Sequence, residues 1–245
     1  MCMSKRFPVI MCVLLTTILM SMVQVQALLY NFENPDQLND FVIDEGDWVI
    51  KDGVLEGRLP AGEYLGLHLE YPGSKIWTDY VVEVEGTWLE DLGSAGESAQ
   101  VEIYFRYVDA QNRYFLDANY VLSNSGLYAQ VAGAWPDIGG GRQPVPGIPD
   151  EEKHLYTIEL EGESIKVYVD GNVMFDITDA NFSEGTIGLG GYGSLVQFDN
   201  LRIDGEDIPA SAVEAHGKLA TSWGSLKSCQ TYSVQQSAFS NQQVK

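Results

Sequence analysis

Short stretches in which every second residue is apolar constrain this 245-residue chain more than any other feature. The stretches 81–86, 101–106, 156–160 and 165–170 all show this pattern. A period of two with one apolar face is typical of a β-strand that is half-buried in a sheet. About a dozen such candidates follow one another, at the spacing expected of a sandwich or barrel.

The residues between these stretches fit tight reversals of the chain. Asp52-Gly53 and Asp170-Gly171 are hairpin signals, because glycine tolerates a positive φ. No long amphipathic helix is found over residues 28–204, so the crossover helices of a parallel sheet are missing. The sequence therefore predicts an all-β domain of two antiparallel sheets packed face to face.

The N-terminal segment has the layout of a secretory signal peptide. Lys5 and Arg6 precede the apolar run 9–23, and small or medium residues lie at the cleavage-site positions that end in Ala27. A retained membrane anchor is the alternative, but a spanning helix needs about 20 apolar residues and this run is shorter. We therefore expect a secreted or periplasmic protein, with no stable membrane insertion after cleavage.

Cleavage after Ala27 would also change the composition of the chain. It leaves Cys229 as the single cysteine, so the mature domain has no internal disulfide. Loss of Lys5 and Arg6 takes the formal net charge from −21 to −23. Nucleic acids and anionic membrane surfaces need a basic footprint, so we expect neither as a partner.

The charge distribution marks the end of the β domain near Gly205. Beyond it acidic and basic residues cancel, whereas the net negative charge lies in residues 28–204. The segment 225–245 is rich in Ser and Gln, a composition typical of disorder. We predict a signal peptide over 1–27, the β domain over 28–204, and over 205–245 a linker and largely disordered polar tail that could contact a protein partner.

Seven short motifs occur in a familiar order along the β domain. They are Tyr30–Glu33, Gly46–Leu55, Tyr104–Tyr107, Asn112–Leu116, Ile165–Gly171, Gly185–Gly190 and Val196–Ile203. In order and spacing the chain resembles the concanavalin A-like lectin/glucanase superfamily, and within it the laminin-G-like and 3-keto-disaccharide hydrolase type of domain. The resemblance implies a jelly roll with one concave sheet. Such folds host lectins, glucanases and adhesion modules, so the fold alone does not decide the activity.

The resemblance also implies a structural calcium ion that joins the first strand to the last. The matching residues are Glu33 and Asp199, with Asp52 beside a tight turn as a third candidate. Calcium prefers oxygen ligands, and an acidic chain without a disulfide gains from a cation that joins its ends. The alternatives are that Asp199 caps a strand or pairs with Arg202, and that Glu33 is solvated.

The acidic residues do not show the catalytic pattern of the superfamily's glucanases. Laminarinase-type members carry Glu-x-Asp-x-x-Glu on one strand, and this pattern is absent from the sequence. Glycosidases nevertheless need only a pair of carboxyl groups. In a chain this acidic, a pair from different strands could still converge, so catalysis is not excluded.

Aromatic side chains and one arginine are the candidates for ligand binding, because sugar rings stack on flat side chains and polar groups bond their hydroxyls. The predicted ligand-binding residues are Trp135, Arg106, Tyr104, Tyr128, Tyr114 and Trp88.

Trp135 is the main candidate, because it lies in the long Gly- and Pro-rich stretch 132–149. An ordinary surface loop, with Trp135 covering the core, is the alternative. In the stretch 101–106, alternation places Tyr104 and Arg106 on the polar face with Glu102. There Arg106 could bind a sugar oxygen, or pair with Glu102 or a cross-strand acid.

Together these features predict a secreted, non-catalytic module that binds an oligo- or polysaccharide and is stabilised by calcium. A hydrolase of the 3-keto-disaccharide type and an adhesion module that binds another protein are the two alternatives.

Overall fold

The computed structural model describes residues 27–62, 65–93, 99–145 and 152–209. The predicted signal peptide up to residue 26 and the tail from residue 210, with Cys229, lie outside the described residues. No described helix is long and apolar enough to cross a membrane.

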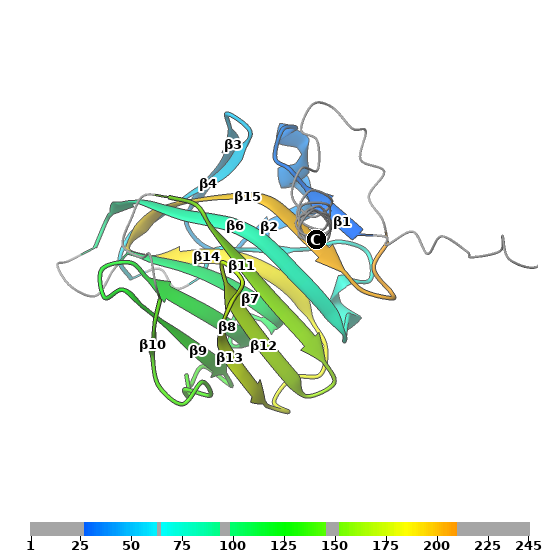
Figure 1. The fold of residues 1–245 in the computed structure, drawn as a ribbon. Coiled ribbons are helices and arrows are strands. Elements are labelled where there is room, and N and C mark those ends of the chain that lie inside the picture. Colours follow the sequence, from blue (N-terminus) through cyan, green and yellow to red (C-terminus); the bar gives the residue numbers. More distant parts are fainter. Residues whose placement is uncertain (1–26, 63–64, 94–98, 146–151, 210–245) are drawn as a thin grey trace, which may run out of the picture. The chain divides into compact units, whose positions relative to one another are not determined.

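The described chain is an all-β sandwich of two antiparallel sheets (Figure 1). The larger sheet has eight strands in the order β13-β12-β11-β6-β15-β4-β3, and β1 also pairs with β15. Their bounds are β1 Ala27–Tyr30, β3 Asp47–Lys51, β4 Val54–Leu59, β6 Tyr80–Asp91, β11 His154–Glu161, β12 Ser164–Val169, β13 Asn172–Thr178 and β15 Ser194–Asp204.

The smaller sheet has seven strands in the order β10-β9-β8-β7-β14-β5-β2. Their bounds are β2 Phe41–Ile43, β5 Leu67–Leu69, β7 Gln100–Asp109, β8 Asn112–Asn119, β9 Asn124–Gln130, β10 Gln143–Pro144 and β14 Thr186–Tyr192. Two short 3-10 helices, η2 Pro35–Asp40 and η3 Ser74–Ile76, are the described helices. The antiparallel all-β sandwich predicted from the alternating stretches is confirmed.

The core lies between the two sheets and is built from the apolar residues of the alternating stretches. On β7, Val101, Ile103 and Phe105 are at most 1% exposed, and on β11 Tyr156 and Ile158 are fully buried. Burial of a single such side chain stabilises the fold by about 1.5–3 kcal/mol. The opposite face of each strand is thus left for solvent or for function.

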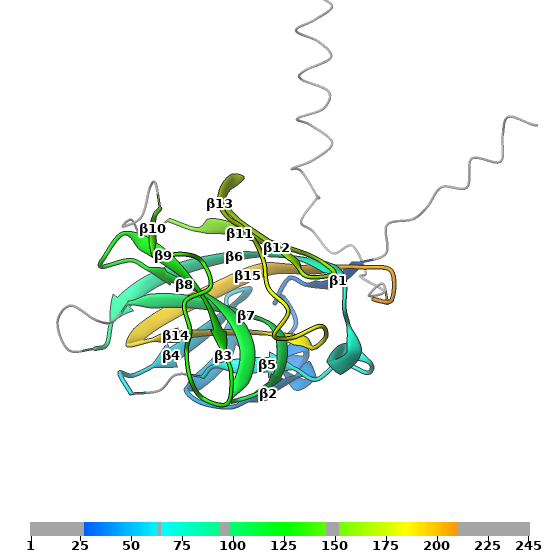
Figure 2. The same ribbon diagram turned by 90° about the horizontal axis from the view of Figure 1, so that it is seen from below.

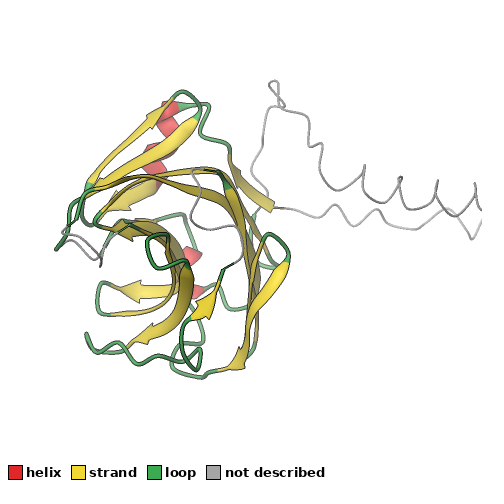
Figure 3. Ribbon diagram, turned by 60° about the vertical axis from the view of Figure 1, so that its left-hand side comes forward, coloured by secondary structure: helices red, strands yellow, loops and turns green. Residues whose placement is uncertain are grey.

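The sheets are curved layers, and the smaller one curls within the larger in Figures 2 and 3. Two predicted hairpins form the two edges of the larger sheet. Asp52-Gly53 joins β3 to β4 and Asp170-Gly171 joins β12 to β13, all four residues having positive φ. Two consecutive positive φ values are those of a type I′ turn, whose twist matches that of the strands it connects.

A bulge in β7 interrupts the alternation where the sequence predicted Arg106 on the open face. The pairing of β7 with β8 shifts between Phe105 and Asp109, and Arg106 has a φ of 43°. The bulge turns the Arg106 side chain inward, where it is 1% exposed. The predicted placement of Arg106 on the polar face with Glu102 is therefore wrong.

The Arg106 guanidinium instead joins three backbone segments at one end of the sandwich. It donates to the carbonyl of Thr78 at 2.9 Å, of Phe182 at 3.0 Å and of Gly162 at 2.6 Å. The Asp79 carboxylate lies 3.8 Å away. Arg106 thus satisfies carbonyls that the strand ladders leave without partners.

Candidate functional site

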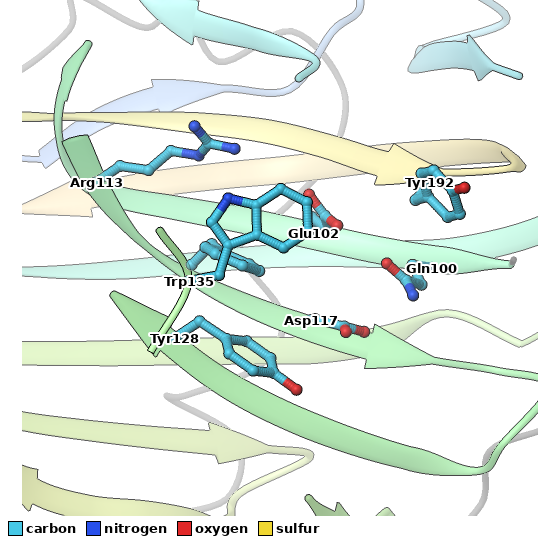
Figure 4. Close-up of a pocket in the computed structure, with 8 residues that line it drawn as sticks. Gln100, Glu102, Arg113, Asp117, Tyr128, Trp135 and Tyr192 are labelled. Atoms are coloured by element: carbon cyan, nitrogen blue, oxygen red, sulfur yellow. The ribbon is translucent and has the colours of Figure 1, made fainter. Parts of the chain in front are cut away.

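A pocket of about 280 Å³ opens on the face of the smaller sheet that points away from the core (Figure 4). Its lining residues come from β7, β8, β9, β14 and the segment after β9, and they are Gln100, Glu102, Arg113, Phe115, Asp117, Tyr128, Trp135 and Tyr192. The volume is about that of small ligand sites. The pocket combines aromatic rings with charged groups.

Strand register places two acidic residues directly opposite each other in this pocket. Glu102 of β7 pairs with Asp117 of β8, and each is 5% exposed. The same row across the sheet continues to Gly190 on one side and Gly126 on the other. The acid pair is therefore flanked by two residues that have no side chain.

Two tyrosines lie over these glycines. A Cβ added to Gly190 would lie 2.0 Å from the Tyr104 hydroxyl oxygen, and one added to Gly126 would lie 2.5 Å from the Tyr128 ring. Any side chain at either glycine would displace the tyrosine. The close approach of Tyr104 thus explains Gly188 and Gly190 of β14.

Asp117 is fixed by an arginine from the segment that follows β9. Arg142 donates to its two carboxylate oxygens at 2.7 and 3.0 Å, a bidentate pair. The same guanidinium donates to the Tyr128 hydroxyl at 3.0 Å and to the Asn124 side chain. Burial raises the pKa of Asp117, and the hydrogen bonds and charge of Arg142 oppose that shift.

Glu102 has a different environment. The Tyr104 hydroxyl donates to its carboxylate at 2.8 Å. Burial, and next the charge of Asp117, raise the pKa of Glu102 to about 7, while Tyr104, Arg113 and Arg142 act in the opposite direction. Two adjacent carboxyl groups with different partners are a common arrangement for proton transfer and for polar ligand binding.

Aromatic rings form one side of the pocket. Phe115 stacks on Tyr128 with ring centroids 5.0 Å apart, and Trp135 meets the edge of Phe115 at 6.4 Å. Trp135 is 47% exposed although it is a large apolar side chain. Figure 4 shows the Trp135 ring on the pocket side of the sheet, with Glu102 beside it in this view.

Arg113 packs against the aromatic rings, with its guanidinium carbon 5.6 Å from the centroid of the Phe115 ring. Its guanidinium stacks over the Tyr104 ring at 4.8 Å and donates to the Ala110 carbonyl at 2.6 Å. A buried cation over an aromatic face contributes about 2 kcal/mol. Arg113 thus covers Tyr104 and brings positive charge to the acid pair.

The structure gathers some of the predicted ligand-binding residues and separates others. Trp135 and Tyr128 line the pocket, and Tyr104, which is 1% exposed, contacts it through its hydrogen bond to Glu102. Tyr114 points into the core, where its hydroxyl donates to Asp179 at 2.6 Å. Trp88, on β6 of the other sheet, stacks on Tyr120 at 5.9 Å. Tyr114 and Trp88 therefore lie outside the pocket, as does Arg106.

The acid pair was missed by sequence reasoning, as were Arg113 and Arg142 as its partners. Alternation places Glu102 on the same face of the strand as Tyr104, and this pattern could have indicated that Glu102 belongs to the site. Asp109 pairs with Asn112 at the turn between β7 and β8, and an uninterrupted ladder from there would place Glu102 opposite Asn119. The bulge shifts the partner of Glu102 to Asp117.

The residues predicted to bind calcium have other partners. Asp199 is 3% exposed and accepts from Lys153 Nζ at 2.7 Å and from the Asn200 N–H at 2.8 Å. Glu33 lies exposed against Gly53, beside the equally exposed Asp52. No three His, Cys, Asp or Glu side chains are grouped for a metal among the described residues. These side chains do not supply the about six to eight oxygens that calcium prefers, so calcium stays a prediction.

We expect the Lys153 ammonium group to stabilise the buried Asp199 carboxylate. The variant Lys153→Met leaves a buried carboxylate without its ammonium, so we expect a loss of about 1–2 kcal/mol in unfolding free energy. If Lys153 alone neutralises Asp199, addition of a chelator leaves the melting temperature unchanged. A melting temperature that falls on chelation and returns with calcium would instead support the ion, because a ligand of the folded state stabilises it.

Comparisons with known proteins agree with this fold. Residues 31–204 match the family model described as the 3-keto-alpha-glucoside-1,2-lyase-like domain. A comparison with curated proteins finds no match to this chain.

Three solved structures share the architecture at low identity. The carbohydrate binding module CBM66 from Bacillus subtilis is 21% identical, with a TM-score of 0.58 over 68% of this chain and 96% of that one. The GH43 BlXynB protein from Bacillus licheniformis is 11% identical, with a TM-score of 0.54 over 72% of this chain and 39% of that one. The laminarinase catalytic domain from Thermotoga maritima is 14% identical, with a TM-score of 0.51 over 73% of this chain and 97% of that one. Likeness at these identities concerns the fold.

Proposed function

Because the chain belongs to the 3-keto-alpha-glucoside-1,2-lyase-like family, whose model matches residues 31–204, we propose that this jelly-roll domain binds an oligo- or polysaccharide in the pocket of its smaller sheet. Following the signal-peptide prediction, it does so outside the cytoplasm.

One observation carries the proposal. The pocket places an exposed tryptophan, Trp135, and the stacked rings of Phe115 and Tyr128 beside the buried acids Glu102 and Asp117. Flat rings match the apolar faces of a sugar, and charged groups form strong hydrogen bonds to its hydroxyls. Trp135 is also well placed for solvent access, which a structural tryptophan does not need. A carbohydrate binding module among the similar folds is in keeping with this function.

The direct test is a glycan array with the purified domain, followed by calorimetry with soluble forms of any glycan retained. We expect retention of one glycan class and competition by the free saccharide. A domain that retains no glycan at pH 6 or pH 8, and instead captures a protein of the native envelope regardless of added sugar, would favour the adhesion alternative.

Cleavage of the bound sugar is a second candidate, favoured by the acid pair. Glycosidases use two carboxyl groups, of which one is held protonated by its environment while the other stays ionised. Burial and Asp117 raise the pKa of Glu102 to about 7, whereas Asp117 is held by Arg142. The name of the family also describes a lyase of 3-keto-α-glucosides.

Mass spectrometry of the bound glycan after incubation separates the two candidates. If the domain only binds, the glycan is recovered intact with the natural protein. If it cleaves, products appear with the natural protein and disappear with Glu102→Gln, which retains the shape of the side chain but cannot transfer a proton.

A further inference from the structure

Two acidic side chains face each other in the pocket. If both were ionised, their repulsion and burial would destabilise the fold. Glu102 and Asp117 are cross-strand partners, each 5% exposed. Like charges directly opposite each other destabilise a sheet, and burial makes each ionised carboxylate more costly. One proton held by the pair removes the repulsion.

The hydrogen-bond partners indicate which acid holds that proton. Asp117 receives two donors from the charged Arg142, an arrangement that favours the ionised form. Glu102 receives the neutral Tyr104 hydroxyl at 2.8 Å. Arg113 on β8 is the other charged group near Glu102, and it lies over the Tyr104 ring. Gln100 of β7 and Tyr192 of β14 complete the surroundings.

The balance of these groups favours a neutral Glu102. Burial and Asp117 outweigh Tyr104, Arg113 and Arg142, and they raise the pKa of Glu102 to about 7 from an ordinary value of 4.5. An ionised carboxylate only accepts hydrogen bonds, whereas a neutral carboxylic acid also donates one.

We propose that Glu102 binds the saccharide as a neutral acid, donating a hydrogen bond to an acceptor oxygen of the ligand, while Asp117 stays ionised and accepts from a ligand hydroxyl. This inference rests on the proposed saccharide-binding function. The ligand class that fits is an uncharged sugar that presents an acceptor oxygen and a hydroxyl side by side. A sugar acid that presents its carboxylate to Asp117 is disfavoured.

Affinity should then fall as the pH rises. Below the pKa of Glu102, about 7 in the free protein, the donor is present and affinity is constant. Above it each further pH unit costs about a tenfold loss in affinity, because a proton must be taken up on binding. Calorimetry with the retained saccharide should show about tenfold weaker binding at pH 8 than at pH 6.

Three variants separate this contact from a structural role. Glu102→Gln retains an N–H donor, so we expect binding close to that of the natural protein at pH 6 and no dependence on pH. Tyr104→Phe removes a group that lowers the pKa of Glu102, so the pH midpoint should move upward. Glu159→Gln is the control, because Glu159 also accepts from a tyrosine, Tyr168 at 3.0 Å, but lies exposed on the other sheet. It should leave the pH profile unchanged.

Several results would overturn the inference. Affinity that rises with pH, affinity that is flat in the natural protein, or loss of binding in Glu102→Gln at every pH would each show that Glu102 binds as a carboxylate or not at all.

A titration of the ligand-free protein distinguishes failure of this inference from failure of the proposed function. Carboxyl 13C NMR, assigned with Glu102→Gln, reports the Glu102 proton without any saccharide. Titration near the ordinary value of 4.5 with saccharide binding intact overturns this inference alone. Titration near neutral pH in a protein that binds no saccharide overturns the proposed function, and the ligand contact with it.

Discussion

Arg106→Met is expected to lower the unfolding free energy by about 3–5 kcal/mol and the melting temperature by about 10 °C. The guanidinium is 1% exposed and bonds the carbonyls of Thr78, Phe182 and Gly162. Methionine has similar bulk but no donor, so three carbonyls lose their partner at once. Each buried acceptor left without a hydrogen bond costs about 1–3 kcal/mol.

Arg202→Met is the matched control. Arg202 is 31% exposed and pairs with Glu83 at 3.0 Å and with Asp204 on the outer face of the larger sheet. Ion pairs that stay in contact with solvent contribute about 0–1 kcal/mol, so this variant should melt within a few degrees of the natural protein. Equal losses in the two variants, measured by chemical denaturation, would contradict the role assigned to Arg106.

Trp135→Ala is expected to weaken saccharide binding about thirtyfold, a loss of about 2 kcal/mol. Trp135 provides the most accessible ring of the pocket and is 47% exposed. Because so little of the fold depends on an exposed side chain, the unfolding free energy should change by less than about 0.5 kcal/mol. Calorimetry and thermal denaturation of the same sample measure both quantities.

Trp88→Phe provides the comparison with a tryptophan outside the pocket. Trp88 is half-buried on β6 and stacks on Tyr120. We expect its replacement to change the melting temperature slightly and the affinity not at all. An affinity loss in Trp88→Phe equal to that in Trp135→Ala would show that the pocket is not where the sugar binds.

Alternation and turn chemistry were sufficient to predict the architecture. Residues such as Ile103 and Ile158 are apolar because they face the other sheet, and a period of two reports that directly. The hairpin turns at Asp52-Gly53 and Asp170-Gly171 could be predicted because a type I′ turn requires residues that tolerate a positive φ.

The pocket could be predicted only in part, because alternation assumes an uninterrupted strand. The bulge after Phe105 removes Arg106 from the open face and leaves Tyr107 near Tyr104 instead. It also moves the partner of Glu102 from Asn119 to Asp117. A bulge has no strong local signature when no glycine marks it. Sequence reasoning thus found two of the lining rings, Trp135 and Tyr128, but neither Phe115 nor the acid pair.

The pairing of Asp117 with Arg142 could not be predicted from the sequence either. Arg142 lies 25 residues further along the chain, in a segment without alternation. Its position depends on how the Gly-rich stretch folds back, where Asp137 accepts from the N–H groups of Gly139 and Gly141 at 2.8 and 3.0 Å. Such local turns follow from tertiary packing as much as from composition.

Seven of the eight residues that line the pocket come from positions 100–135, and only Tyr192 is contributed from elsewhere. The lining of the pocket is therefore encoded almost entirely by one contiguous stretch of the gene, whereas the eight-stranded sheet draws on both ends of the domain. Exchange of residues 100–142, which include the Arg142 that holds Asp117, should transfer ligand preference between relatives while the scaffold stays in place. Diversification of this kind of domain needs only local change, within the three consecutive strands β7, β8 and β9 and the segment after them.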